Sequence, residues 1–356
     1  MRHSIPRLVF WLAVMSGTTL AQPAPNPVPF LDQLSHPTAV PGGPPFTLTV
    51  DGAGQQVAAA QTGSVVPPSN PLQVALLKWY RANQVTMFNV GSSPEGLAFD
   101  GASIWVANTG SGTLTKLRAS DAATLGTFTT PGSPEALAFD GANIWATIGI
   151  GVAKVRASDG TVLGTFTVGS NPISLAFDGT NIWVVNSGDK TVTKLRASDG
   201  KNLGTFPVGT SPDGVAFDGA NIWVVNNYDN TVTKLRASDG KTLGTFNVGN
   251  SPWEVAFDGS NIWVTNTADN TVSKLRASDG TVLGTFTVAA SEPRSLAFDG
   301  ANIWVANFIS NNVTELRASD GKVLGTFNVG INPNAVAFDG ANIWVANSIS
   351  NTVSKL

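Results

Sequence analysis

Four acidic side chains of this chain come shortly after a proline, and together they could do chemistry. Glu95, Glu135 and Asp213 each follow a proline directly, and Glu254 follows one by two residues. Paired carboxylates can act as acid and base on a sugar or hold Ca²⁺ or Mg²⁺ through their oxygens. The two histidines lie within the first 36 residues and there is no cysteine. Residues 37–356 therefore lack imidazole and thiolate chemistry, and only carboxylate chemistry is open to them.

A repeat of about 40 residues positions these carboxylates. Six copies contain Leu-Ala-Phe-Asp-Gly, then Ile-Trp-Val-x-Asn, Thr-Val-x-Lys-Leu-Arg-Ala-Ser-Asp-Gly and Leu-Gly-Thr-Phe, with small variations, and the seventh contains the first part of this pattern. The tryptophans that mark the copies are Trp105, Trp145, Trp183, Trp223, Trp263, Trp304 and Trp344. A fixed period of this length indicates stacked copies of one small unit.

Each copy reads as four short β-strands. In the fourth copy these are residues 212–219, 221–226, 231–239 and 243–249, which are rich in Val, Thr, Phe and Trp. Asp-Gly pairs and Gly-Pro punctuation separate them, as expected for tight hairpin turns. Four antiparallel strands in about 40 residues are typical of a β-propeller blade.

The two ends of the repeat region predict a closed ring. The seventh copy stops at Leu356 after its third strand, and the sequence of residues 86–91 nearly matches the missing fourth strand. An open array would leave unpaired strand edges, which proteins avoid. We therefore expect an all-β fold over residues 74–356: a seven-bladed β-propeller of four-stranded antiparallel blades, closed by an N-terminal strand that completes the last blade.

These motifs resemble the YVTN/NHL-type repeats of bacterial β-propellers, and the repeat style is similar to that of virginiamycin B lyase-like proteins. The resemblance covers about residues 74–356 and implies the propeller fold. It does not imply the lyase activity, which in that group relies on a histidine in the ring, whereas this ring has none.

The N-terminal residues predict export. Residues 1–21 have a basic start, an apolar stretch and a small-residue cleavage site, as in a signal peptide. Residues 22–73 form a Pro/Gly/Ala-rich linker with a possible Ig-like remnant. The mature chain is expected without a transmembrane segment, in the periplasm, at the cell surface or secreted. A net charge of −3 argues against a nucleic-acid partner.

The copies differ mainly on one rim of the predicted ring. The Phe-Asp-Gly and Arg-Ala-Ser-Asp turns of the other rim repeat almost unchanged, whereas the residues after the linking prolines and the turns between second and third strands vary. Varied polar and aromatic groups on a uniform frame favour a ligand-binding face, and drift at tolerant loops is the alternative. The candidate ligand-binding residues are Glu95, Glu135, Ile173, Asp213, Tyr228, Trp253, Glu254, Arg294, Phe308 and Asn334.

Three functions fit this sequence. The first is an exported, monomeric, non-enzymatic protein that binds a protein, peptide or glycan at the variable rim and uses no cofactor. The second is a Ca²⁺- or Mg²⁺-dependent hydrolase or lyase with Glu95, Glu135 and Asn334 as metal ligands, loosely like lactonase-type propellers. The third is a purely structural envelope protein. No catalytic residue is assigned.

Overall fold

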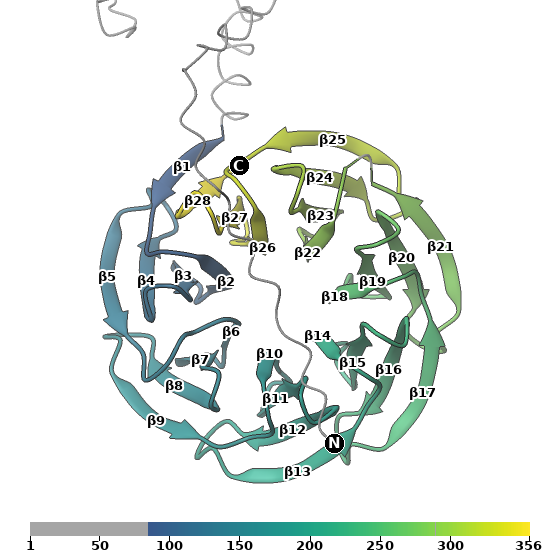
Figure 1. The fold of residues 1–356 in the computed structure, drawn as a ribbon, viewed down its shortest axis with the longest axis horizontal. Helices are drawn as coiled ribbons and strands as arrows, with labels where there is room; N and C mark the ends of the chain where they lie inside the picture. The colour runs from purple at the N-terminus through teal and green to yellow at the C-terminus, as the bar shows by residue number, and fades with distance from the viewer. Residues whose placement is uncertain (1–84, 289) are drawn as a thin grey trace, which may run out of the picture. The chain divides into compact units, whose positions relative to one another are not determined.

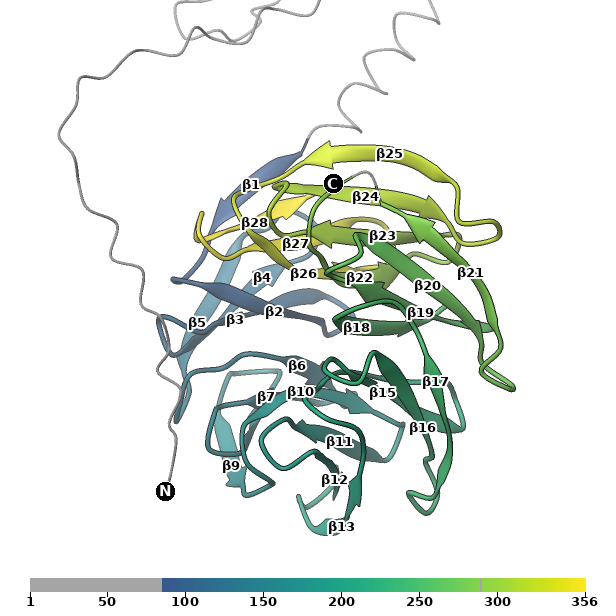
Figure 2. The ribbon, with the colours of Figure 1, turned by 45° about the vertical axis from the view of Figure 1, so that its right-hand side comes forward.

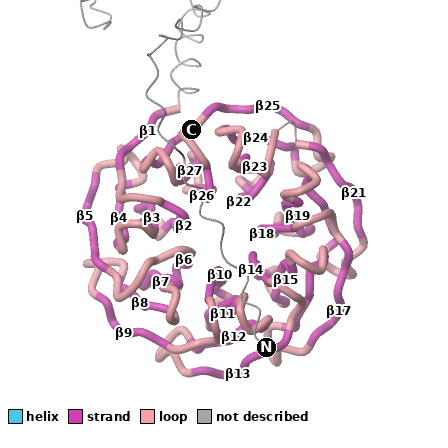
Figure 3. The backbone as a smooth tube through the Cα atoms, in the orientation of Figure 1, coloured by secondary structure: helices cyan, strands magenta, loops and turns pink. Residues whose placement is uncertain are grey.

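The computed structural model describes residues 85–288 and 290–356, which form a ring of seven four-stranded antiparallel sheets (Figure 1). The described part contains strands, turns and loops but no helix (Figure 3). None of its elements is thus a long apolar helix of the kind that could span a bilayer. The predicted seven-bladed all-β propeller is confirmed. The predicted signal peptide (1–21), the linker (22–73) and residues 74–84 lie outside the described residues.

Within six blades the strands run outward from the ring centre in chain order, whereas the outermost strand of the seventh blade is the N-terminal one. The innermost strands are β2 (Pro94–Phe99), β6 (Leu137–Phe139), β10 (Pro172–Phe177), β14 (Pro212–Phe217), β18 (Pro252–Phe257), β22 (Pro293–Phe298) and β26 (Pro333–Phe338). The second strands are β3 (Ser103–Asn108), β7 (Asn143–Thr147), β11 (Asn181–Asn186), β15 (Asn221–Asn226), β19 (Asn261–Asn266), β23 (Asn302–Asn307) and β27 (Ile343–Asn347).

The two outer strands complete each blade. The third strands are β4 (Thr113–Arg118), β8 (Val152–Arg156), β12 (Thr191–Arg196), β16 (Thr231–Arg236), β20 (Thr271–Arg276), β24 (Asn312–Arg317) and β28 (Thr352–Lys355). The outermost strands are β5 (Thr124–Thr129), β9 (Val162–Phe166), β13 (Asn202–Pro207), β17 (Thr242–Asn247), β21 (Val282–Thr287), β25 (Val323–Asn328) and, for the seventh blade, β1 (Thr86–Asn89).

The N-terminal strand closes the ring as the sequence predicts. β1 pairs antiparallel with β28, with Phe88 opposite Val353 and Thr86 opposite Lys355, and both ribbon views show β1 beside β28 (Figure 2). The Phe88 ring lies 6.2 Å from that of Trp344, in the place of the Phe–Trp pairs of the other blades. No sheet edge is therefore left open between the first and last blades.

The repeated tryptophans fill the space between blades. Six of the seven are fully buried, in clusters that join one blade to the next. Each indole N–H donates to the Asp of the preceding Phe-Asp-Gly turn at 2.7–2.8 Å. The same carboxylate caps the turn, as when Asp218 accepts from the backbone N–H of Ala220 and Asn221. The aspartate thus stabilises the turn and also gives the buried indole N–H its hydrogen-bond acceptor.

Lysines link neighbouring blades on the rim of these turns. The third-strand lysine of six blades donates from Nζ to an alanine carbonyl of the next blade's Arg-Ala-Ser-Asp turn at 2.6–2.7 Å. Each Nζ also lies 5.0–5.2 Å from the ring centroid of its own blade's tryptophan. These lysines are Lys116, Lys154, Lys194, Lys234, Lys274 and Lys355.

The turns of the opposite rim depend on a left-handed residue. Asn230 has φ of 56° and its Oδ1 accepts from the N–H of Ser251 in the next link at 2.9 Å. Asn270, Asn311 and Asn351 repeat this arrangement. In the third blade Lys190 takes the position with φ of 58° and cannot accept a hydrogen bond. A long side chain in this region of φ is disfavoured, whereas Asn tolerates it.

We expect Lys190→Asn to stabilise the ring by about 1 kcal/mol, which raises Tm by about 2–4 °C. The new amide would accept from the N–H of Ser211, as Asn230 does from Ser251. Thermal melts would measure the gain, with Asn230→Lys as the reciprocal variant that loses a similar amount. A melt that is unchanged in Lys190→Asn would contradict this account.

Candidate ligand-binding channel

A β-bulge at the start of the innermost strand aims side chains at the ring centre. In the fourth blade Pro212 is opposite Asn226, but the next pair is Val215 with Val224, so Asp213 and Gly214 are left out of the ladder. The fifth and sixth blades have the same shift, and the first, third and seventh blades have a one-residue form. Bulges redirect side chains at functional sites, and here they free the residue after the linking proline.

The innermost strands of all seven blades line a cavity of about 240 Å³. The lining comes from the starts of these strands, at the centre of the ring in Figure 1. Of the ten candidate residues, the structure brings seven together here. They are Glu95, Glu135, Ile173, Asp213, Trp253, Glu254 and Asn334.

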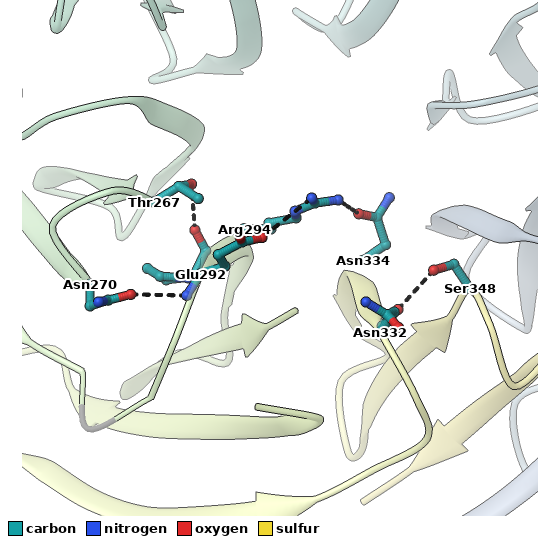
Figure 4. A network of polar contacts seen from close by, with 8 residues as sticks. Thr267, Asn270, Glu292, Arg294, Asn332, Asn334 and Ser348 are labelled. Atoms are coloured by element: carbon teal, nitrogen blue, oxygen red, sulfur yellow. Dashed lines mark hydrogen bonds and ion pairs between the residues drawn. The ribbon is translucent and has the colours of Figure 1, made fainter. Parts of the chain in front are cut away.

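Arg294 connects Phe308 to Trp253 of the cavity wall. Its guanidinium carbon lies 4.8 Å from the ring centroid of Trp253 and 3.3 Å from that of Phe308. One guanidinium N–H donates to Oδ1 of Asn334 at 3.1 Å, and the other end lies 3.5 Å from Oε2 of Glu292 (Figure 4). Arg294 is thus held between two aromatic rings at the cavity edge. Phe308 contacts the site through Arg294.

Tyr228 lies apart from the other candidates. It occupies the turn between β15 and β16, where its side chain is 80% exposed, and it does not line the cavity. Its backbone N–H donates to the carbonyl of Thr210 in the preceding link. Tyr228 therefore belongs to the outer part of the variable rim.

The cavity makes three carboxyl groups hard to ionise. Burial raises the pKa of Glu135 to about 7, and the nearby Glu95 and Asp213 carboxylates add to the rise. Burial alone raises the pKa of Asp213 to about 7. Burial also raises the pKa of Glu254 to about 7; a hydrogen bond from its neighbour's backbone opposes the rise, and Asp213 adds to it. These groups hold a mixture of protons and negative charge near neutral pH.

Glu95 has the same tendency in weaker form. Burial raises its pKa, while a hydrogen bond with Thr109 and the positive charge of Arg294 lower it. The cavity thus contains four acidic side chains and one arginine at its edge. Such a lining attracts a positively charged group that brings its own hydrogen-bond donors.

The predicted metal ligands do not fit a Ca²⁺ or Mg²⁺ site. The amide oxygen of Asn334 already accepts from Arg294, and its Nδ2 points to the backbone carbonyl of Glu95 at 3.4 Å. A divalent cation between Glu95 and Asn334 would also meet the guanidinium charge. Within residues 85–288 and 290–356, no three acidic, histidine or cysteine residues come close enough together to hold a metal.

Phe308 was named in the sequence analysis, but three isoleucines that lie with it on the variable rim were missed. We call Phe308, Ile309, Ile331 and Ile349 of the sixth and seventh blades the apolar rim sector. The three isoleucines are 54%, 49% and 63% exposed, and the N–H of Ile349 donates to the carbonyl of Ile331. For two of them the signal was available in the sequence, because the turns between second and third strands carry Ile-Ser at residues 309–310 and 349–350, where three other copies carry Gly-Asp, Tyr-Asp or Ala-Asp.

Solved structures of other propellers share this fold. Virginiamycin B lyase from Staphylococcus aureus superposes with a TM-score of 0.66 at 16% identity, over 76% of this chain and 98% of that one. A catalytically inactive His-to-Ala variant of it, solved with quinupristin, gives a TM-score of 0.67 over the same shares. Kuenenia stuttgartiensis hydrazine synthase gives 0.65 at 16% identity, over 74% of this chain and 95% of that chain. No protein-family model and no curated protein sequence matches the chain. The similarity to virginiamycin B lyase-type propellers is therefore confirmed at the level of fold, consistent with a YVTN/NHL-type repeat protein.

Proposed function

We propose that this propeller is an exported, non-enzymatic, monomeric binding protein. Its ligand is a peptide or protein segment that places a lysine or arginine in the channel and apolar side chains on the apolar rim sector. The observation that carries the proposal is the convergence of four acidic side chains on one cavity. Arg294 at the cavity edge contacts Phe308 of that sector.

The charge of the cavity favours a cationic ligand over a neutral glycan. Glu135, Asp213 and Glu254 have no ion-pair partner among the described residues, so an incoming ammonium or guanidinium group would be their counter-ion. One face of Trp253, the aromatic ring in the cavity wall, is covered by Arg294, which competes with a stacked sugar. Hydrophobic anchors next to a charged pocket are a usual basis of peptide recognition.

The hydrolase or lyase alternative has less support. It needs a divalent cation held by Glu95, Glu135 and Asn334, and the Asn334 oxygen is engaged by Arg294. A lyase like virginiamycin B lyase would need a histidine in the ring, and the ring has none.

We expect trilysine to bind the intact protein more tightly than triglutamine, with an affinity that rises as pH increases through about 7. The three carboxyl groups have pKa values of about 7, so raising the pH ionises them and strengthens attraction for a cation. The double variant Asp213→Asn, Glu254→Gln should weaken trilysine binding by about tenfold or more. Titration calorimetry at pH 6 and pH 8 measures both effects.

The matched control is Asp239→Asn, which removes an exposed carboxylate from the opposite rim. It should leave trilysine binding unchanged. Equal binding of trilysine and triglutamine would contradict the proposal of a cationic ligand. So would a loss of trilysine affinity in Asp239→Asn as large as that in the double variant. Binding in a glycan array that Trp253→Ala abolishes would instead assign the channel to a sugar.

A further inference from the structure

Charge is distributed unevenly around the channel. The first, second, fourth and fifth blades contribute the acids, which are Glu95, Glu135, Asp213 and Glu254. The sixth blade contributes Arg294 instead, at the position directly after the linking proline. In a ring of seven the sixth blade stands opposite the second and third, as β22 stands opposite β6 and β10 in Figure 1. The channel therefore has a positive side that faces a negative side.

The guanidinium group on the positive side has more donors than acceptors. Of its five N–H groups, one donates to Oδ1 of Asn334 at 3.1 Å. The contact with Oε2 of Glu292 is 3.5 Å long, whereas a strong pair of this kind measures about 2.7–2.9 Å. The Nε N–H of Arg294 is buried and has no acceptor among the residues that the structure describes. A partly buried charge with so few hydrogen bonds is costly, and an acceptor from a ligand would offset that cost.

The position of Arg294 favours a planar anion as that acceptor. Its guanidinium carbon lies between the rings of Trp253 and Phe308, at 4.8 Å and 3.3 Å from their centroids. An arginine held in this way offers its N–H groups along the edge of the guanidinium plane. A carboxylate matches that edge with two parallel N–H···O bonds, which a neutral amide carbonyl cannot do.

The apolar rim sector adjoins the positive side of the channel. Phe308 of that sector contacts Arg294, and Ile309 follows Phe308 in the same turn. A peptide with apolar side chains on this sector would therefore carry its backbone past Arg294 before a basic side chain enters the channel. An internal residue would present only a neutral carbonyl there. The last residue of a chain would present a carboxylate.

We propose that the channel binds the C-terminal residue of its ligand and that this residue is a lysine or arginine. Its α-carboxylate pairs with the guanidinium of Arg294, and its side-chain cation lies across the channel near Glu135 and Asp213. The preceding residues leave over the apolar rim sector. The cavity of about 240 Å³ is smaller than the roughly 300–1,000 Å³ of drug-sized pockets and suits a single residue. This inference rests on the proposed cationic ligand and adds the end of the chain to it.

Trilysine and trilysine amide give opposite results for the two ways of binding. The amide lacks the C-terminal carboxylate and therefore carries one more positive charge. If the acidic lining attracted charge alone, the amide would bind at least as tightly as trilysine. We expect the amide to bind the intact protein about tenfold more weakly, because it leaves Arg294 without its anion. Titration calorimetry at pH 8 measures both affinities.

Two variants should remove this preference for the free carboxylate. Arg294→Gln removes the guanidinium, and Asn334→Asp supplies a carboxylate that would pair with Arg294 in place of the ligand. In both, the amide should bind as tightly as trilysine or more tightly. Arg276→Gln is the matched control, because it removes an exposed arginine of the opposite rim, and it should keep the tenfold preference. If Arg294 only supported Trp253, Arg294→Gln would weaken both probes alike and leave their ratio unchanged, which would contradict the proposal.

The wild-type protein separates this inference from the proposed function. Amide binding that is equal to or tighter than trilysine binding would overturn the C-terminal assignment and leave the cationic ligand standing. Binding of neither probe would overturn both.

Discussion

Raising the pH from 5 to 8 is expected to lower the free energy of unfolding of the ring by a few kcal/mol. Glu135, Asp213 and Glu254 have pKa values of about 7 in the folded ring, well above their ordinary values near 4. Between about pH 4 and pH 7 the folded state binds more protons than the unfolded state, so the free energy of unfolding falls as pH rises. This fall in stability is complete above about pH 7, where the carboxyl groups are ionised in both states.

Urea unfolding at pH 5, 6.5 and 8 measures this dependence. The triple variant Glu135→Gln, Asp213→Asn, Glu254→Gln should be nearly as stable at pH 8 as at pH 5, because its amides do not titrate. The pH dependence of stability between pH 5 and 8 should therefore come from these three acids, and the turn carboxylate Asp218 titrates at lower pH. Burial opposes ionisation of Asp218, but hydrogen bonds from Trp223, Asn221 and the turn amides outweigh it and lower its pKa. A wild-type stability that rises from pH 5 to pH 8 would contradict the placement of the three acids.

Asp218→Ala is expected to destabilise the ring by about 3 kcal/mol or more. Oδ2 of Asp218 accepts from the indole N–H of Trp223 at 2.8 Å, and Oδ1 accepts from the backbone N–H of Asn221 at 2.6 Å. Trp223 is fully buried, so alanine would leave its N–H without an acceptor in the interior. Urea unfolding monitored by tryptophan fluorescence measures the loss.

The matched control for this substitution is Asp239→Ala, in the other Asp-Gly turn of the same blade. Asp239 pairs with Arg236 at 3.0 Å, and both side chains are about half exposed. Exposed ion pairs contribute less than about 1 kcal/mol, so this variant should lose little stability. Similar losses in the two variants would mean that the carboxylate acts only as a turn residue and not as the acceptor for the indole.

The comparison of Asp218 with Asp239 also shows what the sequence could predict. The Asp-Gly pairs correctly indicate turns, and Gly219 and Gly240 have the expected positive φ values of 96° and 73°. Because a turn explains the pair fully, the sequence contains no separate sign that only one of the two carboxylates accepts from an indole. That difference depends on the folding of the first two strands of the blade, which brings the Asp218 carboxylate to the indole N–H of Trp223.

Contacts between blades were the least predictable part of the fold. The ring, its closure by β1 and the position of residues after the linking prolines follow from the period and from local strand patterns. The ammonium of Lys194, by contrast, meets a carbonyl of Ala237, and no local pattern relates these two residues. A lysine in an apolar strand reads as solvent-exposed, although Lys194 is 7% exposed.

The candidate channel was predicted in part. Position in the repeat brought Glu95, Asp213 and Asn334 to one cavity, because equivalent positions of a ring face the same axis. Arg294 lies beside Trp253 and Phe308 through side-chain length and rotamer, which a repeat pattern does not specify.

The bulges after Pro212 and Pro252 let one strand serve both strand pairing and ligand recognition, with different residues for each. Residues inside the ladder must preserve pairing, whereas the two that bulge out are free of it and can change with little effect on folding. A lineage that duplicates such blades can therefore alter its recognition surface one blade at a time, while the frame that carries it stays constant.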